Sequence, residues 1–326
     1  MIKKIAKKFL KKLFFISNKT LNMSNLISLF DAGSTSTRLH IYSFVGDKLC
    51  KKGCFFHYEP LGIDTVERTL TNLLQNITSD IPVSFYATAG LREDKYSEEI
   101  LKIVEKHMSN YNLVEIRLLT GEEEAIGLVD AFEYFFPEIE NYLLMDMGGK
   151  STQIVYKENG NKKFEVIETG ISSKKKFKEE SANSKVEFID NKHNITDNSY
   201  NFNITDNSNN LIKELHAFSA FSDSLEQFNG KTLGEIKQIK NDACKEALKC
   251  HLRNITDNKI INNITDKNKI CQDCDDMNFV IGFLESSKIH ENTIIRSFKH
   301  VDDLYLSWPV GRALYLRNIL REKNIN

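Results

Sequence analysis

Two stretches of the chain share one hydrophobic pattern: an apolar run that ends in an aspartate, a loop of small residues, and then an alternating run. The first begins at Leu29 and reads LFDAGSTSTRLHIYSF, and the second begins at Leu143 and reads LLMDMGGKSTQIVY. The alternation after each loop is typical of a strand, whereas a helix follows the glycine loop of Walker-type and dinucleotide-binding proteins. The pattern therefore predicts a strand–loop–strand unit twice, with Asp31 and Asp146 at equivalent strand ends.

The remaining pattern alternates predicted strands with predicted helices, which indicates an α/β fold. Thr120 and Glu123 have the spacing of a capping box, so a helix is expected to begin there. The polar, repetitive stretches 172–210 and 254–269 predict surface insertions without regular structure. Helices are predicted at 63–77, 97–108, 122–135, 211–228, 233–250 and 308–321, strands at 83–86 and 113–119, and apolar stretches at 277–285 and 293–298.

The composition fits a globular protein of one large or two medium domains. Of 326 residues, 41% are hydrophobic, which is enough for a sizeable core. The formal net charge of −1 gives no general attraction to nucleic acid, so no nucleic-acid partner is expected. The chain has only 15 glycines, so their clustering in the two loops is not background.

The first sixteen residues, MIKKIAKKFLKKLFFI, form a separate pattern of apolar and lysine positions at helical spacing. Such a cationic amphipathic helix suits the surface of an anionic membrane or a targeting role. Its apolar part is too short to span a bilayer and too interrupted for a secretory signal. The alternative is a dispensable extension upstream of a true start at Met23. We treat residues 1–24 as an N-terminal extension.

Cysteines and glycosylation sequons together indicate an oxidising compartment, so the secretory pathway (endoplasmic reticulum or Golgi lumen) or secretion is expected. Several sequons are copies of one Asn-Ile-Thr-Asp unit, which repeat expansion also produces without glycosylation. The Cys-x-x-Cys spacing at 271–274 also fits zinc, so the late cysteines form either disulfides, which we favour, or a metal site. The close pairs are Cys50/Cys54, Cys244/Cys250 and Cys271/Cys274, and sequons begin at Asn18, Asn22, Asn76, Asn194, Asn203, Asn254 and Asn263.

The chemistry of the two loops points to phosphate. Backbone N–H groups of Gly-rich loops surround a phosphate without side-chain obstruction, and the flanking hydroxyls add donors. A carboxylate beside such a loop is able to hold a divalent cation. Two copies suggest two halves of the molecule closing on one polyphosphate, whereas two ordinary hairpin turns are the alternative.

These residues also identify a family. The chain resembles the apyrases, or nucleoside triphosphate diphosphohydrolases, and most closely their small secretory-pathway branch, which favours nucleoside diphosphates. The match runs in order from about residue 26 to residue 322, and weaker similarities are AFSAFSD at Ala217 and CDDMNFV at Cys274. Its main motifs are DAGSTSTR at Asp31, ATAGLR at Ala87, GEEEA at Gly121, DMGGKST at Asp146 and SWPVGRALYL at Ser307.

The resemblance implies a two-lobed actin/sugar-kinase-like (ribonuclease H-like) α/β fold with the active site in the cleft between the lobes. Lobe I would comprise residues 25–120 plus 305–326, and lobe II residues 121–304 with the two insertions. A disulfide between Cys244 and Cys274 is also implied, which leaves Cys250–Cys271 as the natural second bridge.

The resemblance further implies roles for individual residues in hydrolysing a nucleoside di- or triphosphate. Glu124 would be the general base for an attacking water that Ser151 and Gln153 orient. Asp31 and Asp146 would hold Ca²⁺ or Mg²⁺, largely through waters. The phosphates would lie against Gly33, Ser34, Thr35, Thr88, Arg92, Gly148, Gly149 and Ser151.

The chain also departs from the family pattern. Lys150 stands where alanine is usual, and it would either grip a phosphate or obstruct the site. Val129 and Glu133 replace a usual tryptophan and asparagine, and the segment after the fourth motif is short, so base specificity is not implied. Trp308 either packs structurally, which we favour, or lies near the base. A metal-dependent hydrolase is therefore the leading prediction, with a nucleotide-binding protein without turnover and an exopolyphosphatase-like phosphatase as alternatives.

Overall fold

A computed structural model describes residues 25–173, 189–190, 193–194, 213–242, 244 and 264–325, and within these it leaves the side chains of 189–190, 193–194, 264–273 and 323–325 undescribed. The predicted N-terminal extension, with its expected membrane association, lies outside the described residues. So do most of the two predicted insertions and Cys250, on which the expected second disulfide depends.

The first sheet contains the first strand–loop–strand unit and has the strand order β3-β2-β1-β4-β5. β2 is antiparallel to both β1 and β3, whereas β4 and β5 continue the sheet in parallel on the other side of β1. Helices α2 and α4 cover one face through a core of buried aliphatic and aromatic residues. The strands are β1 Leu26–Ala32, β2 Thr37–Val45, β3 Lys48–His57, β4 Val83–Ala87 and β5 Leu113–Leu118, and the helices are α2 Val66–Leu74 and α4 Ser97–Met108.

The second sheet has the strand order β12-β11-β6-β7-β8 and contains the second unit. β7 is antiparallel to both β6 and β8, whereas β11 and β12 continue in parallel on the other side of β6. Its outer face packs against α7, α9 and a helix at 233–242. The elements are β6 Tyr142–Met147, β7 Thr152–Glu158, β8 Asn161–Ile167, β11 Glu214–Ser219, β12 Ile294–Ser297, α7 Ala220–Leu225 and α9 Ile264–Ser286.

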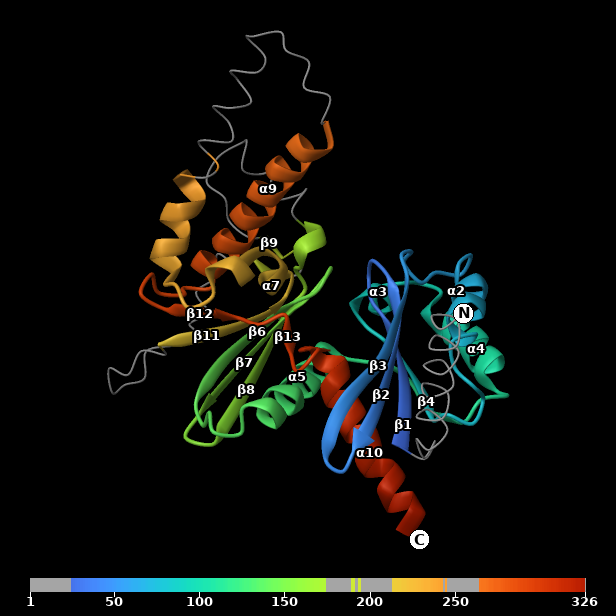
Figure 1. Cartoon of the computed structure of the whole chain (residues 1–326). Helices are drawn as coiled ribbons and strands as arrows, with labels where there is room; N and C mark the ends of the chain where they lie inside the picture. Colours follow the sequence, from blue (N-terminus) through green and yellow to red (C-terminus); the bar gives the residue numbers. More distant parts are fainter. Residues whose placement is uncertain are drawn as a thin grey trace, which may run out of the picture.

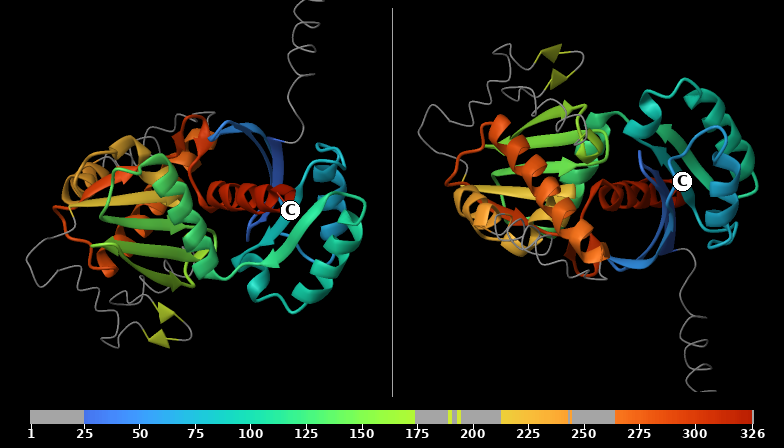
Figure 2. Two further views of the ribbon diagram at one scale, coloured as in Figure 1. Left: turned by 90° about the horizontal axis from the view of Figure 1, so that it is seen from below. Right: turned by 90° about the horizontal axis from the view of Figure 1, so that it is seen from above.

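Two helices join the halves. α5 (Gly121–Phe135) and α10 (Trp308–Ile325) lie between the sheets, as Figures 1 and 2 show from three directions, and they share a central core with both of them. The helices approach so closely that a Cβ on Gly311 would meet the backbone of Gly127. We retain the lobe boundaries 25–120 plus 305–326 and 121–304 as a proposal.

Short elements complete the described fold, and among the helices of the described residues none is both long and apolar enough to cross a membrane. Two small hairpins are formed by β9 with β10 and by β13 with β14. The short elements are α3 Ala89–Arg92, η2 Ile171–Ser173, η3 Glu226–Phe228, β9 Ile189–Asp190, β10 His193–Asn194, β13 His300–Val301 and β14 Leu304–Tyr305.

The predicted α/β class is confirmed, and so is the capping box at Thr120, where the backbone N–H of Glu123 donates to the threonine hydroxyl at 3.1 Å. The helix predicted at 211–228 is wrong, because 214–219 is strand β11 and only 220–225 is α-helical. β11 is a short strand between β6 and β12 that runs directly into α7, so the apolar residues of strand and helix merge into one pattern that a single helix also fits.

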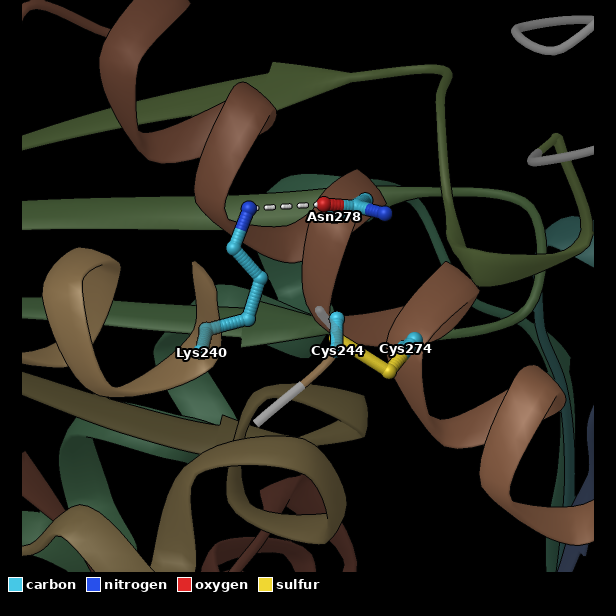
Figure 3. Close-up of a disulfide and its surroundings, with 4 residues drawn as sticks. All are labelled: Lys240, Cys244, Cys274 and Asn278. Atoms are coloured by element: carbon cyan, nitrogen blue, oxygen red, sulfur yellow. Dashed lines mark hydrogen bonds between the residues drawn. A yellow bond between two sulfur atoms is a disulfide. The ribbon is translucent and has the colours of Figure 1, made fainter. Parts of the chain in front are cut away.

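The disulfide implied by the resemblance is present in the structure. Cys244 is joined to Cys274 of α9, with 6.1 Å between their Cα atoms (Figure 3). One helical turn away, Lys240 donates to the side-chain oxygen of Asn278 at 2.8 Å. Cys50 and Cys54, in contrast, carry free thiols. They lie on one strand, where residues four apart are separated by about 13 Å, so this close pair is unable to bridge.

Candidate active site

The two predicted phosphate loops have the same backbone geometry and touch one another. In the first loop Gly33 N donates to Ser36 O at 3.0 Å, and in the second Gly148 N donates to Ser151 O at 2.9 Å. A Cβ on Gly149 would collide with the Ser34 hydroxyl of the opposite loop. The glycine therefore allows the two loops to approach within van der Waals distance.

A cavity of about 220 Å³ lies at these loops, and its walls come from both sheets. The residues predicted for catalysis, phosphate binding and metal binding line it, with the exception of Arg92. They are Asp31, Gly33, Ser34, Thr35, Thr88, Glu124, Asp146, Gly148, Gly149, Ser151 and Gln153.

Glu124 is presented to the cavity by the first turn of α5. The capping box at Thr120 fixes where this helix begins, and Glu124 is only 6% exposed. Burial raises the pKa of Glu124 to about 8, and the charges of Asp31 and Asp146 act in the same direction. Arg92 opposes the shift, because it stabilises the ionised carboxylate. A carboxyl group with such a pKa exchanges protons near neutral pH, as a general base requires.

Arg92 lies behind Glu124 and connects the two halves of the molecule. It follows β4 in the first half, and its Nη1 donates to Glu124 Oε1 at 2.5 Å and to the Leu119 carbonyl at 3.0 Å. Its Nη2 donates to Ser151 Oγ, in the second loop, at 3.2 Å. Arg92 thus holds the carboxylate and the hydroxyl in fixed positions, whereas the sequence resemblance places it on phosphate.

Ser151 and Gln153 form the rest of this network. Both are 3% exposed, and Gln153 Nε2 donates to Ser151 Oγ at 3.0 Å. The serine oxygen therefore accepts from both Arg92 and Gln153, which leaves its own proton to donate elsewhere. Because Ser151 lines the cavity, a bound oxygen atom there is a suitable acceptor.

The two aspartates differ in their partners. Asp31 Oδ2 accepts from Arg38 Nη1 at 3.2 Å, whereas Asp146 Oδ1 is buried and has no hydrogen-bond partner among the described residues. Burial raises the pKa of Asp146 to about 6, with Asp31 contributing, and a hydrogen bond from Ser219 opposes the shift. Burial also raises the pKa of Asp31 against the opposing effect of Arg38.

The donor set suits a hard cation that keeps most of its waters. Asp146 lines the cavity and has one buried oxygen without a partner among the described residues, which Mg²⁺ or Ca²⁺ would suit because both ions prefer oxygen ligands. In the described part of the chain no group of three or more His, Cys, Asp or Glu side chains forms a direct metal cage. The residues present therefore fit a cation held through water better than one held by protein ligands alone.

The sequence prediction left the roles of Lys150 and Trp308 open and assigned none to the remaining polar residues of the cavity. Lys150 lines the cavity with its side chain exposed, so it does not fill the site. Trp308 lines it too, but the ring is 7% exposed and packs edge-on against Tyr86. The other unassigned polar lining residues are Arg38, Ser219, Asp223, Tyr305 and Ser307. Apart from Tyr305 they stand inside the motifs already quoted, so position in a motif is the signal that finds them.

Comparison with known proteins decides the family. The model of the GDA1/CD39 (nucleoside phosphatase) family matches residues 22–201, which is more than half of the chain. The chain belongs to this family. The result confirms the resemblance to the apyrases that the ordered motifs indicate.

Relatives and solved structures agree with this assignment. Guanosine-diphosphatase of Saccharomyces cerevisiae is 27% identical over 183 residues, which are 46% of this chain and 35% of the yeast protein. The guanosine-diphosphatase of Schizosaccharomyces pombe is 28% identical over 160 residues, 40% of this chain and 29% of that protein. The matched region thus spans about a third of these relatives.

The fold is shared with bacterial proteins of low sequence identity. The Aquifex aeolicus PPX-GPPA enzyme has a TM-score of 0.56 at 17% identity, covering 89% of this chain and 99% of its own. An exopolyphosphatase from Cytophaga hutchinsonii has a TM-score of 0.56 at 16% identity, covering 91% and 98%. These likenesses confirm the two-lobed α/β fold.

Proposed function

We propose that the protein hydrolyses nucleoside di- or triphosphates to release phosphate, by direct attack of a water that Glu124 activates. The observation that carries the proposal is the position of Glu124. It is a buried carboxylate on the wall of a cavity that two facing phosphate loops enclose. Family membership and the guanosine-diphosphatase relatives support the same reaction class.

The phosphates would lie between the loops at Gly33–Thr35 and Gly148–Gly149, whose amide groups are the donors. Phosphoryl transfer depends mostly on positioning and on neutralising charge, so converging donors and a base are sufficient. Asp31 and Asp146 would hold Mg²⁺ or Ca²⁺, which when bound neutralises phosphate charge. Glu124 would take the proton of the attacking water, and the free proton of Ser151 would hold that water in place.

Arg92 has a positioning role in this scheme. Its contacts with Glu124 and Ser151 fix the base and the hydroxyl relative to each other across the two halves. Lys150, on the cavity wall with an exposed side chain, is compatible with turnover and is available to contact an outer phosphate. We also propose that the protein works in an oxidising compartment of the secretory pathway, which the Cys244–Cys274 bond supports.

A phosphate-release panel tests the function. The substrates are GDP, UDP, ADP, the matching triphosphates and inorganic polyphosphate, each with Mg²⁺, with Ca²⁺ and with a chelator. We expect multiple turnovers on nucleotides that need the cation. Glu124→Gln should lower kcat by roughly 10²- to 10⁴-fold, the usual contribution of a general base, while circular dichroism shows the native fold.

The panel also separates the alternatives. If the purified wild type bound nucleotides without releasing phosphate, it would be a nucleotide-binding protein. If it released phosphate from polyphosphate alone, it would be an exopolyphosphatase. Unchanged turnover in Glu124→Gln would remove Glu124 from the role of base.

A further inference from the structure

Two exposed aromatic rings stand at the end of β3. Phe56 is 47% exposed and Tyr58 is 81% exposed. Their rings stack with centroids 5.7 Å apart and an angle of 8° between the planes. We call this pair the aromatic shelf. Tyr58 in particular buries little of a large ring, so an open aromatic face is offered to the solvent.

The shelf is connected to the cavity by Arg38. In the pairing of β2 with β3, Arg38 stands opposite Phe56, so both side chains lie on the same face of the first sheet. The guanidinium carbon is 5.8 Å from the centre of the Phe56 ring. Arg38 also lines the cavity and donates to Asp31 at 3.2 Å. A chain of contacts thus runs from Asp31 through Arg38 to the Phe56 ring of the shelf.

The cavity itself is too small for a whole nucleotide. Its volume of about 220 Å³ is below the roughly 300–1,000 Å³ typical of sites that enclose a small organic molecule. It suits the phosphates, and the nucleoside of a bound nucleotide would extend out of it. Among the described residues, the aromatic side chains of the cavity wall make contacts within the protein: Trp308 is buried against Tyr86, and Tyr305 packs edge-on against His300.

We propose that the aromatic shelf stacks the base of a nucleotide whose phosphates occupy the cavity, with Arg38 between the base and the phosphates. The inference rests on the proposed function, since it extends the same site. Stacking on a flat ring tolerates any base, because every base has a π-face. The shelf therefore accounts for nucleotide binding but does not select among bases.

Comparing a nucleotide with a phosphate chain tests the proposal. Kinetic constants of Phe56→Ala and Tyr58→Ala are measured with GDP and with inorganic tripolyphosphate, which has no base. Loss of one stacking contact weakens binding by roughly 5- to 100-fold, so KM for GDP should rise by that factor with little change in kcat. The constants of Tyr58→Ala for tripolyphosphate should stay at the wild-type value, and this variant is the diagnostic one because Phe56 also contacts Arg38.

Two further variants serve as controls. Tyr58→Phe keeps the ring and should bind GDP as the wild type does. Tyr315→Ala removes an exposed ring on α10, about 10 Å along the helix from Trp308, and should leave both ligands unaffected.

The same comparison is made by calorimetry in Glu124→Gln, so that it does not depend on turnover. Weaker GDP binding in the shelf variants would support the shelf even if the wild type proved unable to hydrolyse nucleotides. Unchanged GDP binding, or an equal loss for GDP and tripolyphosphate, would overturn the shelf while leaving hydrolysis established by the phosphate panel. If neither GDP nor tripolyphosphate bound, both proposals would be overturned.

Discussion

The two halves of the molecule repeat one plan. Their strand orders, β3-β2-β1-β4-β5 and β8-β7-β6-β11-β12, are equivalent, with an antiparallel pair on one side of the central strand and parallel strands on the other. Each central strand has an aspartate one residue before its end, and the short loop that follows is closed by an equivalent backbone hydrogen bond. The halves differ instead in the side chains around the two carboxylates.

This difference separates the roles of the aspartates. Asp31 is paired with Arg38, so part of its charge is neutralised before any ligand binds. Asp146 receives a hydrogen bond from Ser219 and keeps one buried oxygen without a partner among the described residues. The same fold therefore supplies to a single cavity one carboxylate in an ion pair with Arg38 and one that only a hydrogen bond and the charge of Arg38 stabilise, without an ion pair among the described residues. We expect Asp146, which lacks the ion pair, to dominate cation binding.

Separate substitution of the two aspartates is expected to give the largest difference between the halves. Asp146→Asn should raise the cation concentration for half-maximal phosphate release by about 10- to 100-fold, the range seen when groups that orient bound cations are lost. Asp31→Asn should have a smaller effect, because Arg38 already offsets that charge. Cation titrations of release and of direct binding by calorimetry measure both. Equal effects in the two variants would show that the Arg38 pair does not distinguish the aspartates.

The pH dependence of turnover is a second test of the difference between the aspartates, because the charges of both raise the pKa of Glu124. With the pKa of Glu124 at about 8, kcat/KM should rise roughly tenfold per pH unit up to that value. Asp31 raises this pKa more than Asp146 does, so Asp31→Asn should lower the midpoint further than Asp146→Asn. A wild-type midpoint near the ordinary glutamate value of 4.5 would contradict the burial effect.

The stability of the fold should fall as pH rises, whereas turnover rises. Because the folded state holds the Glu124 proton more tightly than the unfolded chain, stability contributed by this proton is lost as pH rises from 4.5 to about 8. Denaturant midpoints of the wild type and of Glu124→Gln across this range measure the contribution. The variant, which has no proton to lose there, should show a flatter dependence on pH.

The backbone of each phosphate loop packs closely against a glycine from another segment. A Cβ on Gly170 would lie 2.5 Å from the backbone of Gly148 and Gly149, and a Cβ on Gly90 would lie 2.8 Å from Ser34 Cα. Since backbone is unable to rotate away, Gly170→Ala and Gly90→Ala should each destabilise the fold by about 1–3 kcal/mol, with the larger loss at Gly170. Urea unfolding measures both losses.

A matched control stands in open space. A Cβ on Gly62 would have the Thr65 hydroxyl 3.8 Å away as its nearest neighbour, so Gly62→Ala should change stability by less than about 0.5 kcal/mol. A larger loss of stability in Gly90→Ala than in Gly170→Ala would contradict this prediction.

Much of this arrangement is predictable from the sequence, because local patterns encode it. The apolar runs before Asp31 and Asp146 and the small residues after them predict both strand–loop–strand units, and the Thr120 capping box predicts the start of α5. The pattern fails at β11, where the apolar residues of a short strand merge with those of the helix that follows it directly. Arg92 shows a second limit, since its partner Glu124 is 32 residues away and spacing alone does not reveal which group a guanidinium faces.

The smallest predicted effect concerns the N-cap residues of two equivalent helices, α3 after β4 in the first half and α7 after β11 in the second. Thr88, before α3, has an extended backbone, whereas Ser219, before α7, has φ of 55° and ψ of −121°, a conformation that only glycine adopts without strain. Ser219→Gly should therefore be more stable than Ser219→Ala by about 1 kcal/mol, although both lose the hydroxyl that contacts Asp146.

Thermal unfolding of the two variants measures this strain, and phosphate release measures the hydroxyl separately. Because glycine relieves the backbone without restoring the contact to Asp146, the two variants should lose activity equally while differing in stability. Contact with Asp146 in the second half would then require a strained backbone at Ser219, whereas Asp31 in the first half is paired with Arg38. Equal stability of the two variants would mean that the Ser219 backbone is unstrained, and that the halves differ only in charge.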